Sequence, residues 1–223
     1  MGDRILKALA LVAIAAGVAH AAPGGRVVGK VTVTEADGKS ASADVIVYVV
    51  GFAEKGEGGA ATASIAQKGR TFVPDLVAIT VGESVTFPNG DTFLHNVFSQ
   101  SSARKFDLGS FKKGESKDKS FPNPGVVDVY CNIHPEMAAT ILVLPNKRHT
   151  RTMPDGSFTL DGVPPGRWTV FAYARRAAKP ASTPVTVVAG QDVTVNLSLV
   201  RGGEPPHVNK FGEKYRTPTT TYR

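Results

Sequence analysis

The sequence predicts an all-β sandwich fold. The 223 residues contain no long stretch with the 3.6-residue apolar spacing of an amphipathic helix. Short runs rich in Val and Thr alternate apolar and polar residues instead, and turn residues separate these runs. Many short strands separated by turns are typical of β-sandwiches.

The predicted strands fall into three groups along the chain. Two precede a Gly- and Ala-rich linker at 53–64, at residues 26–34 and 44–52. Five predicted strands follow the linker, at residues 77–81, 84–88, 93–99, 126–131 and 138–144. The polar, charged residues 101–119 between them are expected to form a long, poorly regular loop.

The character of the sequence changes after Pro145. Four further strands are predicted, at residues 154–160, where a turn leads into the strand, 167–176, 183–189 and 192–199. The run 161–166, DGVPPG, is a tight Pro/Gly turn. Residues 201–223 are polar and basic without periodicity, so we expect a flexible or extended tail.

The first 21 residues have the pattern of an export signal. A short basic head precedes an apolar run at 8–18, and Ala19–Ala21 supplies small residues before a cleavage point. The alternative is an uncleaved anchor, but the run is short for a membrane span. No other segment is apolar enough to span a membrane, so we expect an exported protein, located in a bacterial periplasm.

The charge pattern bears on partners. The formal net charge is +7, yet residues 66–144 carry eight basic and eight acidic side chains, so the excess lies elsewhere. No basic stripe interleaves with aromatic residues, which argues against nucleic-acid binding. The excess is either an ordinary solvated surface or a docking face for acidic partners.

A possible metal site lies at the end of one predicted strand. Cys131 is the only cysteine, and His134 and Met137 follow it at three-residue steps. His95 lies on another predicted strand. Two His and one Cys with a distant Met form the ligand set of a blue-copper electron-transfer site. Glu136 is an alternative axial ligand, and Cys131 could instead be a small buried core residue.

Other residues near this set would support it. Pro135 stiffens the loop, which would limit geometry changes between Cu(I) and Cu(II). Asn96 could bridge the two segments that carry ligands. The aromatic residues Phe93, Phe98 and Phe121 would keep the surroundings dry.

These residues resemble a known family. FPNGDTFLHNVFS and VYCNIHPEMAATILVL, within about residues 62–145, resemble the cupredoxins of the plastocyanin and amicyanin kind. The resemblance implies a Greek-key sandwich that binds one copper ion through His95, Cys131, His134 and Met137. The segments 24–61 and 146–200 resemble the two parts of a carboxypeptidase-regulatory-like, prealbumin-type sandwich, which implies that the cupredoxin domain is inserted in it.

The expected function is one-electron transfer between redox partners, such as a c-type cytochrome or a dehydrogenase. Copper handling is an alternative, because the same ligands would serve it. A partner-binding module that carries the copper domain as a passenger is another alternative. An enzyme is not expected, because multicopper catalysis needs further histidines, and a dinuclear centre needs a second cysteine.

Overall fold

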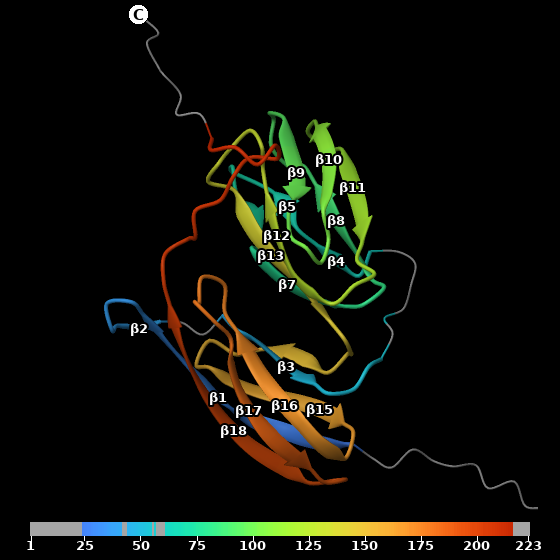
Figure 1. Ribbon diagram of the computed structural model, residues 1–223, viewed down its shortest axis with the longest axis vertical. Helices are drawn as coiled ribbons and strands as arrows, with labels where there is room; N and C mark the ends of the chain where they lie inside the picture. The colour runs from blue at the N-terminus through green and yellow to red at the C-terminus, as the bar shows by residue number, and fades with distance from the viewer. Residues whose placement is uncertain (1–23, 42–43, 55, 57–60, 216–223) are drawn as a thin grey trace, which may run out of the picture.

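The computed structural model describes residues 24–41, 44–54, 56 and 61–215. Every regular element in this part of the chain is a β-strand. Two sandwiches lie one above the other in Figure 1, and the chain passes from the lower one to the upper one and back. The fold is therefore all-β, with one sandwich inserted within the other, as the sequence predicts. The predicted export signal lies outside the described residues.

The lower sandwich combines strands from both ends of the sequence. One sheet has the order β15-β1-β18, with β2 at the edge of β1, and the other has the order β14-β3-β16-β17. The early strands are β1 (Gly25–Glu35), β2 (Ser40–Ala41) and β3 (Ile46–Val50). The late strands are β14 (His149–Arg151), β15 (Ser157–Val163), β16 (Gly166–Tyr173), β17 (Ala181–Val187) and β18 (Asp192–Arg201).

The pairing of β1 with β18 joins the first and the last strand of the described chain. The two strands run parallel, from Arg26 opposite Asp192 to Glu35 opposite Arg201. Gly29 is required at this contact, because a Cβ atom there would lie 1.7 Å from the backbone oxygen of Val195. Alternating inward residues of these strands, among them Val27, Val31 and Leu197, form the core of this sandwich.

The upper sandwich is a continuous insertion between β3 and β14. Its larger sheet has the order β10-β9-β12-β13-β7, and its smaller sheet has the order β11-β8-β4. Its first strands are β4 (Ala63–Ser64), β5 (Ala66–Gln67), β6 (Phe72–Val73), β7 (Leu76–Thr80) and β8 (Ser84–Pro88). The others are β9 (His95–Ser99), β10 (Phe106–Phe111), β11 (Ser116–Ser120), β12 (Gly125–Tyr130) and β13 (Ala138–Leu144).

The two ends of the insertion meet at its base. The backbone N–H of Glu54 donates to the carbonyl of Pro145 at 2.8 Å, and the Glu54 carboxylate accepts from Arg148. A separate apolar cluster of Ile46, Leu76 and Leu142, with Leu144, joins strands of the lower and upper sandwiches. The upper sandwich is thus seated on β3 rather than tethered by its linkers alone.

The expectation of a poorly regular segment at 101–119 is wrong, because β10 and β11 lie there. Alternating positions of β11 are held by lysines whose stems cover aromatic rings. Lys117 lies over Phe111 and Lys119 over Phe106, with the ammonium groups 4.9 and 5.6 Å from the ring centroids. Long lysine side chains cover apolar surface while their charges stay near water, which hides the alternating pattern of the strand from a reading by hydrophobicity.

Candidate metal centre

Three side chains from two separate segments of the sequence converge at one end of the upper sandwich. His95 is the first residue of β9, and Cys131 directly follows the end of β12, which pairs with β9. His134 lies in the loop that leads on to β13. One ligand atom from each of these three residues lies within 4.8 Å of the others. Among the described residues, this is the one group of three such side chains.

The three atoms form a compact triangle. Cys131 Sγ lies 3.9 Å from His95 Nδ1 and 3.8 Å from His134 Nδ1, and the two nitrogens are 3.2 Å apart. A circle through the three atoms has a radius of about 2.1 Å, close to the ~2.0–2.3 Å of metal bonds to imidazole nitrogen and thiolate sulfur. The triangle therefore fits one metal ion near its centre, and the N₂S donor set suits copper.

The loop that carries His134 is closed by its own backbone. Cys131 N–H donates to the carbonyl of Met137 at 3.3 Å, and Met137 N–H donates to the carbonyl of His134 at 3.1 Å. Met137 is fully buried and belongs to the same apolar cluster as Cys131, whereas Glu136 is exposed. Burial therefore favours Met137 over Glu136 as a fourth ligand. Pro135 is exposed on the outside of this loop.

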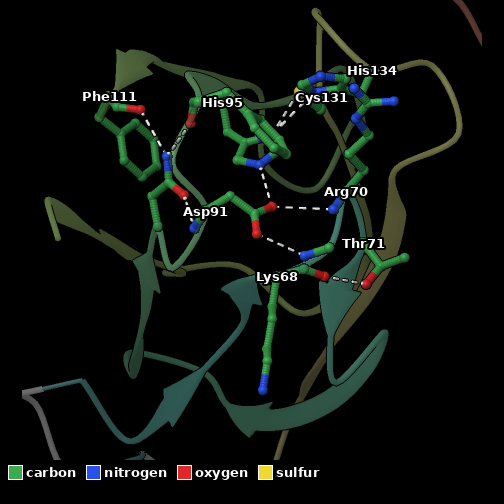
Figure 2. A network of polar contacts seen from close by, with 11 residues as sticks. Lys68, Arg70, Thr71, Asp91, His95, Phe111, Cys131 and His134 are labelled. Carbon is green, nitrogen blue, oxygen red and sulfur yellow. Dashed lines mark hydrogen bonds and ion pairs between the residues drawn. The ribbon is translucent and has the colours of Figure 1, made fainter. Parts of the chain in front are cut away.

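Asp91 is a residue of the site that the sequence reasoning missed. Its Oδ2 lies 2.8 Å from His95 Nε2 and accepts from the backbone N–H of Arg70. Its Oδ1 accepts from the backbone N–H of Gly69 at 2.8 Å (Figure 2). The backbone N–H of Asp91 donates to Asn89 Oδ1 at 2.8 Å, and the Asn89 side-chain amide donates to the carbonyl of Phe111. The available signal was an Asp four residues before the histidine, between the predicted strands 84–88 and 93–99.

The Asp91 carboxylate fixes the tautomer of His95. Burial alone would raise the pKa of Asp91, but hydrogen bonds from Gly69, His95 and Arg70 outweigh burial and lower the pKa to about 2. An ionised carboxylate only accepts hydrogen bonds, so His95 carries its proton on Nε2. In the neutral imidazole, Nδ1 is then the atom that presents a lone pair toward Cys131 and His134, as a metal ligand must.

Asn96 connects the segments that carry the two ligand groups. Its Oδ1 accepts from the backbone N–H of Asn132 at 3.3 Å, and its Nδ2 donates to Asp107 at 2.7 Å. Because Asn96 follows His95 and Asn132 follows Cys131, this amide links the two ligand segments directly. This is the bridging position that the sequence analysis proposed for Asn96.

The triangle borders the apolar cluster that contains Cys131 and Met137, and it is partly open at His134. Phe98 and Phe121, which were expected to keep the site dry, are fully buried, but their ring contacts are with Tyr130 and Phe106. Phe93 is 37% exposed, and its ring centroid lies 5.1 Å from that of His95 and 5.5 Å from that of His134. Burial is the largest cause that lowers the pKa of His134, which favours the neutral imidazole that can bind a metal.

Comparisons with known proteins give one family match and several similar solved structures. The family model of the carboxypeptidase regulatory-like domain matches residues 134–200. No curated protein matches the chain by sequence. In the part of the chain that the structure describes, no helix has the length and apolar character needed to span a membrane.

Among solved structures, the chain is similar to a novel purple cupredoxin from Nitrosopumilus maritimus, at 26% identity over 37% of this chain and 99% of that one, with a TM-score of 0.34. It is also similar to a reduced variant of amicyanin, at 21% identity over 44% and 98%, with a TM-score of 0.35. A copper-containing nitrite reductase from Thermus scotoductus SA-01 matches at 25% identity over 43% of this chain, with a TM-score of 0.37. This chain spans 25% of that reductase.

The sheets and the family match describe a chain of two β-sandwiches. The match to the carboxypeptidase regulatory-like domain includes the late strands of the lower sandwich, and the upper sandwich carries the group of His95, Cys131 and His134 that could hold a metal ion.

Proposed function

We propose that this chain is an exported, mononuclear type 1 copper protein that carries single electrons between redox proteins. The proposed copper ligands are His95, Cys131, His134 and Met137. The chain has two proposed domains, a copper-binding sandwich at 62–145 and a flanking sandwich formed by 24–61 and 146–200. The observation that carries the proposal is the triangle of Cys131 Sγ and the two imidazole Nδ1 atoms. Bound copper would supply a Cu(I)/Cu(II) couple at this position.

The residues around the triangle support electron transfer more than copper handling. His95 is held by Asp91, the 131–137 loop is closed by its backbone bonds, and Met137 is buried. A donor set that is positioned before the metal binds changes little with oxidation state, which suits a carrier. A delivery protein is served better by an exposed, exchangeable set of ligands.

His134 provides the route by which an electron would enter or leave. It is partly exposed, while His95 and Cys131 are fully buried. The surface next to it carries the exposed apolar side chains of Leu94 and Ile133. A redox partner protein, such as a c-type cytochrome or a dehydrogenase, would approach the site at this edge. We propose the periplasm as the compartment, because the export pattern at 1–21 precedes the described residues.

The proposal does not include catalysis. The described residues offer one cluster of potential metal ligands, and a multicopper enzyme needs more than one.

The test is the visible spectrum of the copper-loaded, oxidised protein together with its metal content. We expect one copper per chain and an intense thiolate-to-copper charge-transfer band. Cys131→Ser should abolish the band, whereas His149→Gln should leave it intact, because His149 lies on β14 in the other sandwich. A wild-type protein that binds copper without this band is not a type 1 carrier, and reversible one-electron reduction without copper loss separates carriage from delivery.

A further inference from the structure

The segment after β18 crosses from the lower sandwich to the metal site. In Figure 1 it runs along the side of both sandwiches and ends next to the strands that carry the ligands. Its described part ends at residue 215, and it has no strand beyond Arg201. The expectation of a flexible tail differs from this part of the structure, in which His207, Lys210 and Tyr215 contact the upper sandwich. We call these three residues the C-terminal clamp.

Lys210 completes a ring of hydrogen bonds with both ligand segments. Its backbone N–H donates to Asn132 Oδ1 at 3.0 Å, and its ammonium group lies 2.8 Å from Asp107 Oδ2. Asp107 accepts from Asn96, and Asn96 accepts from the backbone N–H of Asn132. The ring therefore joins the residue after His95, the residue after Cys131 and the tail.

Tyr215 and His207 hold the same loop from a second side. The Tyr215 hydroxyl donates to the carbonyl of Cys131 at 2.9 Å. The His207 ring stacks on Tyr130, which precedes Cys131, with centroids 4.0 Å apart and an interplanar angle of 9°. The rings of His207 and Tyr215 also meet edge to face at 5.4 Å. The residue that offers the sulfur ligand is thus contacted at its own carbonyl and at both neighbours.

Burial shows that the outer face of the sheet is covered at this place. Val97 points into the apolar core, so its neighbours Asn96 and Phe98 point to the other face of β9. An uncovered outer face would leave these two side chains open to water, yet Asn96 is 2% exposed and Phe98 is 0% exposed. Phe98 contacts the Tyr130 ring on which His207 stacks.

We propose that the C-terminal clamp is a positioning element of the copper site, which holds the Cys131 loop against β9. This inference rests on the proposed function, because it concerns the same copper ion. None of the clamp residues touches the ligand triangle, so they act through Asn132, Asn96 and the Cys131 carbonyl. Loss of the clamp would let the loop move relative to His95, which would weaken copper binding and change the geometry at the sulfur.

The experiment uses the full chain with His207→Ala, Lys210→Met and Tyr215→Phe, alone and combined, and Lys214→Met as the matched control. Lys214 is exposed in the same segment. Copper affinity is measured by chelator competition, and the copper centre by its electron paramagnetic resonance and visible spectra. We expect the combined variant to lose about 10-fold in copper affinity, the size of effect typical of residues that orient metal ligands. Its copper hyperfine coupling and thiolate band should also shift, while Lys214→Met matches the wild type.

The outcomes separate this inference from the proposed function. If the segment only stabilises the fold, the substitutions would lower the unfolding midpoint of the metal-free protein and leave both spectra unchanged. That result would overturn the inference. A combined variant that binds copper as tightly as Lys214→Met would overturn it as well. Tyr215→Phe removes one hydroxyl group, so it keeps the test decisive if the combined variant does not fold. A wild-type protein that lacks the thiolate band overturns the proposed function and the inference together.

Discussion

Replacing Asp91 with Asn changes one oxygen of the carboxylate to an amide nitrogen, and three donors depend on those oxygens. Oδ1 accepts from Gly69 N–H, and Oδ2 accepts from Arg70 N–H and His95 Nε2–H. If the amide nitrogen takes the Oδ2 position, it faces two donors. If it takes the Oδ1 position, it faces one, so the variant should adopt that orientation and lose the Gly69 bond.

The size of the effect follows from these bonds. A hydrogen bond to a charged group contributes about 1.5–3 kcal/mol and a neutral one about 0.5–1.5 kcal/mol. Asp91→Asn removes one charge-assisted bond and makes the other two neutral, so we expect the metal-free protein to lose about 2 kcal/mol or more of unfolding free energy. Copper affinity should fall about 10-fold, because the neutral amide holds the His95 tautomer less firmly.

Two measurements check this prediction. Urea unfolding of the metal-free protein gives the change in stability, and chelator competition gives the change in copper affinity. Asp118→Asn is the matched control, because Asp118 lies on β11 in the same sandwich and its side chain is exposed. If Asp91→Asn behaves like Asp118→Asn in both assays, the carboxylate does not hold His95 and the reasoning is wrong.

Three further predictions concern stability. Phe98→Ala should cost about 3–5 kcal/mol in urea unfolding, because Phe98 is fully buried, and a smaller loss would mean that the site collapses around the smaller residue. Gly29→Ala should cost about 1–3 kcal/mol by the same assay, because its Cβ would meet the backbone of Val195, and wild-type stability would contradict the β1–β18 contact. Burial lowers the pKa of His149, with Glu83 opposing, so its contribution is present above the unfolded pKa of about 6.5 and is lost as the pH falls. The stability of His149→Gln should therefore decline less than that of the wild type between about pH 7.5 and about pH 5.5, and parallel curves would refute this.

The convergence of the metal site could be predicted from the sequence because most of its information is local. Cys131, His134 and Met137 lie within seven residues at a strand end, where one loop can surround an ion. His95 was the candidate for the further nitrogen ligand because it lies on another predicted strand. The structure brings His95, Cys131 and His134 together, and their role as copper ligands stays a prediction until metal is measured.

Asp91 was missed because its role depends on a partner segment that the sequence does not identify. The backbone N–H groups of Gly69 and Arg70 lie 22 and 21 residues before Asp91. Only after the chain around β5 and β6 folds back do these donors and His95 meet at one carboxylate. In the sequence, Asp91 was part of an ordinary polar turn.

The tail contacts were missed for a related reason. Residues 201–215 carry no periodic pattern, because they form no strand beyond Arg201 and are held by single side chains. Polar contacts of this kind depend on distances between distant segments and not on the local spacing of apolar residues.

The meeting of Glu54 with Pro145 also determines how the two sandwiches depend on each other. While the upper sandwich is folded, this contact makes the whole insertion behave as a short loop between β3 and β14 of the lower one. If the upper sandwich unfolds, the same connection becomes a flexible loop of roughly 90 residues, whose closure costs on the order of 3 kcal/mol more entropy in free-energy terms. The lower sandwich would thus lose stability although none of its own strands had changed. Any ligand that stabilises the upper sandwich, copper included, would therefore also raise the unfolding free energy of the lower sandwich.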